Sequence, residues 1–180
     1  MIQNIEASRV CCFTGHRPEK ITPEEESILK KRLDEEIERA IFEGYILFVS
    51  GMSRGFDLWA AQSVLALKED YPHIQLEAAL PCIGQDKGWT EKQREEFHHI
   101  LKQTHYQSCL SQEYTPGCMH MRNRYMVDKS TRLIAYYTGV KTGGTAYTYR
   151  YALKKGLYIV NLYPLNAEQL CLSAELDREV

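Results

Sequence analysis

The sequence lacks the features that mark membrane and secreted proteins. No run approaches the ~20 apolar residues that span a bilayer, and the first residues show no basic segment followed by an apolar run, as a signal peptide would. The formal net charge is −2, so no overall positive field attracts nucleic acid or an anionic membrane. We therefore expect a cytoplasmic protein that holds any anion with a local cluster of residues.

Paired cysteine motifs are also missing. The cysteines are Cys11, Cys12, Cys82, Cys109, Cys118 and Cys171, and no two have CxxC spacing. Several lie in apolar runs. We predict reduced thiols that pack as small apolar side chains, and no metal site.

Apolar runs alternate with segments of helical periodicity along most of the chain. Tyr45–Val49 is apolar throughout, which favours a strand covered on both faces of a parallel sheet. Capping boxes at Thr22 and Thr90 each predict a helix start. Strands are expected at about 9–14, 45–49, 74–80, 106–110, 132–137 and 157–162, with helices between them.

This alternation predicts an α/β fold with right-handed βαβ crossovers. We expect a single doubly wound, mostly parallel Rossmann-like sheet with helices on both faces. The length of 180 residues suits one domain. We expect this domain to cover residues 1–165, and the polar residues 166–180 to form a tail that is a short helix or partly disordered.

Three glycine-marked loops follow predicted strands, at 14–17, 50–55 and 142–145. Ligands of such sheets bind beyond the carboxyl ends of the strands, where glycine lets the backbone approach closely. One such loop is commonly just a tight turn, but three on one edge favour a phosphate site. The second and third lead into helix N-termini, which attract anions. The expected ligand-binding residues here are Thr14, Gly15, His16, Arg17, Ser50, Gly51, Met52, Gly55, Asp57, Gly143, Gly144 and Thr145.

None of these loops is a GxGxxG fingerprint or a Walker A loop, so the ligand need not be intact NAD or a nucleoside triphosphate. Asp57 lies at the start of a predicted helix. Its carboxylate either is simply stabilised there by the helix dipole or contacts a ribose or base of the ligand, and both interpretations remain open. Trp89 either covers the cleft or packs onto the next helix, and we favour the second.

Arg122 and Asn123 lie in a predicted basic helix. One interpretation is a solvated helix face. The other is that Arg122 points into the cleft and meets a phosphate by bidentate contact. Helical spacing places Arg122 and Met126 on one face and Arg124 on another. We therefore add Arg122 and Asn123 to the predicted ligand-binding residues.

These motifs together resemble the YpsA-like family of the SLOG superfamily, which is related to DNA-processing protein A (DprA) and to the LOG phosphoribohydrolases. The resemblance rests on Thr14–Arg17, Ser50–Asp57, Arg122–Asp128 and Gly143–Thr145, and spans about residues 9–163. It implies a Rossmann-like fold that binds nucleotides or nucleotide-derived ligands such as ADP-ribose or NAD derivatives. No cofactor is certain beyond such a nucleotide-type ligand.

This sequence differs from LOG enzymes at the position of their catalytic residue. Thr148 stands where those enzymes have their catalytic glutamate, and a threonine poorly activates water or stabilises an oxocarbenium-like sugar. If the protein is an enzyme, it is a nucleoside-monophosphate phosphoribohydrolase in which Arg122 takes part, and Asp57 or Glu77 would have to replace the glutamate. We therefore favour a binding or sensing protein.

The resemblance to DprA implies a third function, binding of single-stranded DNA. The net charge argues mildly against it, although a groove with Arg54, Arg122, Lys141 and Arg150 could provide it. Nucleic acid is therefore an alternative rather than the favoured partner. A homodimer is a further expectation from family analogy alone.

Overall fold

The computed structural model describes residues 9–164. The predicted C-terminal tail and Cys171 lie outside these residues. The strands are β1 Arg9–Gly15, β2 Tyr45–Ser50, β3 Gln75–Leu80, β4 Tyr106–Cys109, β5 Arg132–Tyr136 and β6 Tyr158–Asn161. The helices are α1 Pro23–Phe42, α2 Phe56–Leu67, α3 Glu91–Leu101, α4 Cys118–Lys129 and α5 Gly144–Lys155, with a short 3₁₀ helix, η1, at Pro18–Lys20.

The six strands form one sheet in the order β4-β3-β2-β1-β5-β6. Every neighbouring pair is parallel, so the prediction of a Rossmann-like α/β fold is confirmed and the sheet is wholly parallel. From β1 the chain adds strands in one direction as far as β4, then returns through α4 to place β5 on the other side of β1. The loops after β1 and β5 therefore lead to opposite faces, and such a switch point is where open parallel sheets bind ligands.

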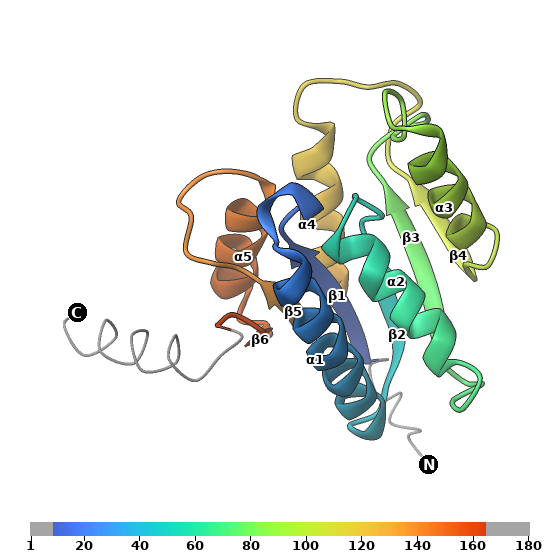
Figure 1. Cartoon of the computed structure of the whole chain (residues 1–180). Helices are drawn as coiled ribbons and strands as arrows, with labels where there is room; N and C mark the ends of the chain where they lie inside the picture. Colours follow the sequence, from blue (N-terminus) through green and yellow to red (C-terminus); the bar gives the residue numbers. More distant parts are fainter. Residues whose placement is uncertain (1–8, 165–180) are drawn as a thin grey trace, which may run out of the picture.

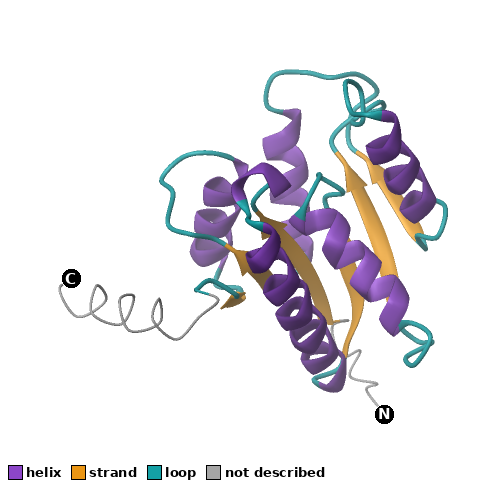
Figure 2. Cartoon of the chain, viewed as in Figure 1, coloured by secondary structure: helices purple, strands orange, loops and turns teal. Residues whose placement is uncertain are grey.

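Helices cover both faces of the sheet (Figure 1). α1, α2 and α3 bury their apolar residues in one core cluster, whereas α4 and α5 contribute to a second cluster on the other face. Figure 2 shows the resulting three layers, with the strands between the two sets of helices. The strands at the centre of the sheet are buried on both sides, which explains the apolar run of β5.

Local signals in the sequence account for the helix starts. Thr22 and Thr90 each cap a helix in a complete capping box, with Glu25 and Gln93 as the reciprocal partners, as predicted. Within residues 9–164, no helix is both long and apolar enough to cross a membrane.

The cysteines of the described range are all free. Cys11, Cys12, Cys82 and Cys118 are buried, which agrees with their predicted role as small apolar side chains. That prediction is wrong for Cys109, which is exposed because β4 is an edge strand.

Candidate ligand-binding site

A cavity of about 470 Å³ lies at the switch point between β1 and β5. Its walls come from the loop after β1, the loop before α2, one face of α4 and the start of α5. We call it the anion cavity. Its lining residues are Thr14, Gly15, His16, Arg17, Lys20, Ser53, Asp57, Met119, His120, Arg122, Asn123, Met126, Thr142, Gly143, Gly144 and Thr145. Ligand pockets commonly start at about 300 Å³.

The N-terminus of α5 opens into this cavity. Gly143, Gly144 and Thr145 all line it, and no side chain caps the helix. Within the described residues, the first N–H of α5 with a partner is that of Tyr147, which donates to the Gly143 carbonyl over 3.0 Å. The preceding N–H groups and the positive end of the helix dipole therefore remain available to an anion.

The N-terminus of α2 is instead covered by protein. The N–H of Phe56 donates to the His16 carbonyl over 3.4 Å, and that of Leu58 donates to the Ser53 carbonyl over 3.2 Å. The loop before α2 consequently contributes only Ser53 to the cavity, together with Asp57 from the helix itself.

Four predicted residues of that loop do not line the cavity: Ser50, Gly51, Met52 and Gly55. The Ser50 hydroxyl donates to the Asp57 carbonyl over 2.8 Å and accepts the Met52 N–H over 3.1 Å. The Ser50 and Met52 side chains are fully buried. Ser50 and Met52 therefore stabilise the conformation of the loop and do not face the cavity.

The glycines of the first two loops are explained by packing inside the protein. A Cβ at Gly15 would overlap the Phe56 ring, and one at Gly51 would overlap the Arg122 guanidinium. The loop before α2 can therefore fold tightly over Arg122 only with glycine at position 51. Of the two, only Gly15 also faces the cavity.

Arg122 lies in the wall of the anion cavity and is 4% exposed. Its Nε donates to Asn123 Oδ1 over 2.8 Å, its Nη2 donates to Ser53 Oγ over 3.2 Å, and its Nη1 donates to the Gly51 carbonyl. A guanidinium has five N–H groups, so two remain for a ligand. Arg122 thus holds the loop before α2 and still presents positive charge to the cavity.

Asp57 is the nearby counter-charge and is also buried. Burial raises the pKa of Asp57 and lowers that of Arg122, while the attraction between the two groups opposes both shifts. Asp57 Oδ2 also accepts the Ser53 N–H over 3.4 Å. Among the described residues lining the cavity, Asp57 is the one carboxylate.

Two further cationic side chains, Arg17 and Lys20, line the cavity. Arg17 and Lys20 are exposed, and within the described residues neither side chain has a hydrogen bond or a salt bridge. Arg54, in contrast, is paired with Glu19 over 2.6 Å. Arg17 and Lys20 can therefore turn toward an incoming anion without breaking an existing ion pair.

His16 joins the loop after β1 to the loop after β5. Its Nε2 accepts the Thr138 N–H over 3.3 Å and lies 3.0 Å from the Thr138 hydroxyl. Burial, and secondarily the charge of Lys20, lower the pKa of His16. The ring therefore serves as a neutral hydrogen-bond acceptor near neutral pH.

We expect His16→Gln to weaken the pH dependence of stability. Below about pH 6.5 the unfolded chain binds a proton before folded His16 does, so the free energy of unfolding falls as the pH falls toward the lowered pKa, with a slope of at most about 1.4 kcal/mol per pH unit. Glutamine keeps an acceptor for the Thr138 N–H but does not titrate. Urea unfolding between pH 7.5 and 5 measures the slope.

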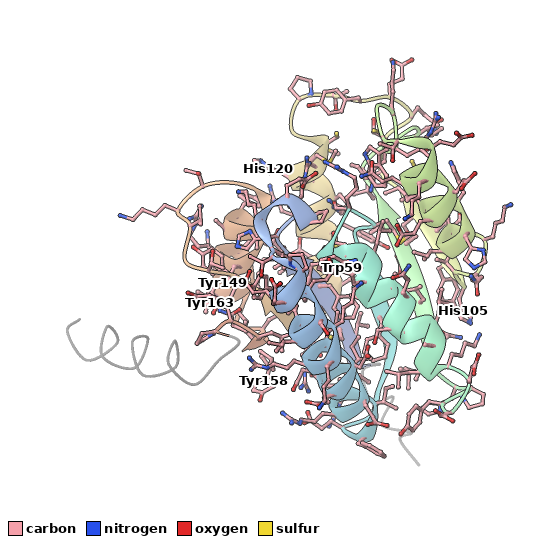
Figure 3. All side chains as sticks on the ribbon, viewed as in Figure 1. Trp59, His105, His120, Tyr149, Tyr158 and Tyr163 are labelled. Carbon is pink, nitrogen blue, oxygen red and sulfur yellow. The ribbon has the colours of Figure 1, made fainter. Side chains whose placement is uncertain are left out.

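His105→Gln is the matched control. Burial, and then the charge of Lys68, also lower the pKa of His105, which lies away from the cavity (Figure 3). Its replacement should flatten the same slope without changing ligand affinity. An unaltered slope in the His16→Gln protein would contradict the assigned role of His16.

The two threonines of the α5 segment have different positions. Thr145 donates its hydroxyl to the Gly15 carbonyl over 2.8 Å, which ties α5 to the loop after β1. Thr148 is fully buried and donates to the Gly144 carbonyl over 2.8 Å. Thr148 therefore presents no reactive group to the cavity. Glu77 of β3 does not line it either, and its carboxylate binds Tyr125 and Lys129 of α4 and Ser108 of β4.

The structure adds six lining residues to the predicted set: Lys20, Ser53, Met119, His120, Met126 and Thr142. The spacing of Met119, Arg122, Asn123 and Met126 is i, i+3, i+4, i+7, which is one face of a helix. Met119 could thus have been predicted from Arg122. His120 lies at the N-terminal end of α4 (Figure 3) and stacks on Tyr147, with 4.2 Å between ring centroids. No local signal in the sequence indicated that pairing.

Comparison with known proteins assigns the family. The YpsA family model, described as "YspA SLOG family", matches residues 11–165. The chain therefore belongs to the YpsA family of SLOG proteins. A UPF0398 protein of Halalkalibacterium halodurans is 33% identical over 129 residues, which are 71% of this chain and 68% of that protein. A UPF0398 protein of Bacillus thuringiensis is 30% identical over 156 residues, covering 82% and 84% of the two chains.

Among solved structures, the fold is similar to that of DNA processing protein A from Helicobacter pylori, which binds single-stranded DNA. The two share 18% sequence identity with a TM-score of 0.56, covering 94% of this chain and 82% of the other. At this identity the likeness concerns the fold.

Proposed function

We propose that this protein binds or senses a nucleotide or a nucleotide-derived ligand of the ADP-ribose type in the anion cavity. The observation that carries the proposal is the uncapped N-terminus of α5, which shares one cavity with Arg17, Lys20 and Arg122. A helix N-terminus and several guanidinium or ammonium groups together favour a phosphate. Asp57 would contact a sugar hydroxyl or a base N–H, since a carboxylate accepts hydrogen bonds.

Binding is favoured over turnover because of what lines the cavity. Thr148 is buried in α5, and Asp57 is engaged by the Ser53 N–H and attracted by Arg122. A second, free carboxylate to activate water or to protonate a leaving group is not among the described lining residues.

A thermal-shift panel with AMP, NAD, ADP-ribose and GTP tests the proposal. At 100 times its dissociation constant, a ligand stabilises the folded protein by about 2.7 kcal/mol. For a chain of this size that raises Tm by about 5–10 °C. We expect at least one of the four to reach this shift. No shift with any of them at millimolar concentration would overturn the proposal.

Gly144→Ala is the variant that localises the effect. Gly144 is the first residue of α5, and an added Cβ would lie 3.7 Å from Asn123 Nδ2, an ordinary contact distance. Both residues line the cavity, so the methyl group would occupy ligand space without clashing with the protein. We expect Tm of the free variant to equal or exceed that of wild type, since alanine favours helix, and the ligand-induced shift to shrink. An undiminished shift would place the ligand elsewhere.

Single-stranded nucleic acid is the second candidate, favoured by the similarity to DNA processing protein A. Lys141, before α5, and Arg150, in the middle of α5, are exposed, and Arg150 Nη1 donates to the Lys141 carbonyl over 2.8 Å. Gel shifts with an oligo-dT strand at 25–200 mM salt test it. Affinity that falls steeply with salt would support it, and undetectable binding at 25 mM salt would exclude it.

A further inference from the structure

A second cavity, of about 420 Å³, adjoins the anion cavity. The two share Arg17, Ser53 and Met119 as lining residues, so they meet at a common wall. The remaining lining differs in character from that of the anion cavity, because it includes two large aromatic side chains. We call it the ring cavity. Its other lining residues are Arg54, Cys82, Gly84, Gln85, Lys87, Trp89 and Tyr114.

Trp89, one of the two aromatic residues that line the ring cavity, also contacts other side chains of the protein. Trp89 packs edge-on against Phe97 of α3, with ring centroids 5.5 Å apart, which confirms that it packs onto the next helix. It also lines the ring cavity, although it is not among the residues that line the anion cavity. The Arg54 guanidinium lies 6.0 Å from the Trp89 ring centroid. Trp89 therefore has ring contacts within the protein that need no ligand.

The other aromatic side chain that lines the ring cavity is exposed. Tyr114, in the loop between β4 and α4, is 70% exposed, although a tyrosine normally buries much of its ring. Gln85 donates to the Gly51 and Met52 carbonyls over 3.2 and 2.7 Å. These bonds fasten the loop carrying Trp89 to the loop that Arg122 holds, which joins the walls of the two cavities.

We propose that the ring cavity is a second subsite for the same ligand, and that it takes a planar aromatic group such as a nucleobase. This inference rests on the proposed function of the anion cavity. Arg17 stands at the shared wall without an ion pair among the described residues, so it is placed to contact phosphate between the two subsites. The ligand class is then a nucleotide in which a phosphate or pyrophosphate group separates the base-bearing part from a second polar part. Bases stack well on Trp and Tyr faces.

The test uses titration calorimetry on the whole chain and compares ADP-ribose with ribose 5-phosphate, which lacks the adenine, its ribose and one phosphate. Variants of Trp89 then isolate the contribution of the base. We expect wild type to bind ADP-ribose at least about 10-fold more tightly than ribose 5-phosphate. Trp89→Leu should lower the affinity for ADP-ribose by about 10-fold and leave that for ribose 5-phosphate unchanged, while Trp89→Phe should retain most of it. Leucine preserves apolar contact with Phe97.

Tyr114→Ala provides a second variant. Because Tyr114 is exposed, its replacement should disturb folding less than replacement of Trp89. It should weaken ADP-ribose selectively as well. Equal weakening of both ligands, or unchanged affinity for both in both variants, would overturn the subsite. If wild type binds ribose 5-phosphate and ADP-ribose with equal affinity, the proposal of a base subsite is wrong but the proposed function stands. If neither ligand binds wild type, the proposed function and the subsite fail together.

Discussion

The Arg122→Met protein is expected to be less stable than wild type by about 3 kcal/mol and to bind ADP-ribose at least about 10-fold more weakly. Methionine fills much of the same volume but removes three hydrogen bonds, to the Gly51 carbonyl, Asn123 and Ser53. It also leaves buried Asp57 without its attracting cation. Urea unfolding and calorimetry with ADP-ribose measure the two effects.

Adding Asp57→Asn to Arg122→Met separates the two effects. The double variant no longer buries an uncompensated carboxylate, and the amide oxygen introduced at position 57 can still accept the Ser53 N–H. We expect it to regain part of the lost stability but none of the lost affinity. Wild-type affinity in the single variant would show that Arg122 serves only to hold the loop.

The largest loss of stability is expected from Arg132→Met, at about 3–5 kcal/mol. Arg132 is fully buried on β5, where Nη2 binds Glu36, and Nη1 binds Glu43 over 2.6 Å. Tyr45 and Tyr158 lie over the guanidinium, with ring centroids 5.3 and 5.0 Å from its carbon. The substitution leaves Glu36, 4% exposed, without its buried counter-charge.

Arg39→Ala is the matched control, because Arg39 binds the same Glu36 over 2.8 Å but is itself 65% exposed. Exposed ion pairs contribute about 1 kcal/mol or less, so this variant should lose far less stability. Arg132 lies at the start of β5, at the opposite end of the sheet from the cavity, so ligand affinity should be unchanged in folded Arg132→Met. A loss of stability under about 1 kcal/mol would contradict the role assigned to this buried pair.

The fold was predictable because its signals are local. Apolar runs, capping boxes and the spacing of turns locate each strand and helix within a few residues. The strand order was not predictable in the same way, because it depends on the long return through α4 that sets β5 beside β1. Contacts between residues so far apart leave no periodic trace in the sequence.

The candidate site was predictable only in part, because glycine has two physical uses. The glycines at 143 and 144 line the cavity, whereas Gly51 makes room for Arg122 and Gly55 lies against Pro18, with an added Cβ 2.7 Å from Pro18 Cδ. Sequence alone does not distinguish approach to a ligand from approach to a neighbouring side chain. Lys20 was missed because the short helix η1 that contains it was not predicted.

The most direct test of the anion cavity is a titration of ¹⁵N-labelled protein with ADP-ribose, followed through backbone amide shifts. We expect the largest shifts at Gly143, Gly144, Thr145 and Gly15, which line the cavity around the uncapped N-terminus of α5. Smaller shifts are expected for the buried residues Ser50, Gly51 and Met52 before α2, which do not line the cavity. An unchanged spectrum at millimolar ADP-ribose, or shifts confined to other parts of the sheet, would contradict the account.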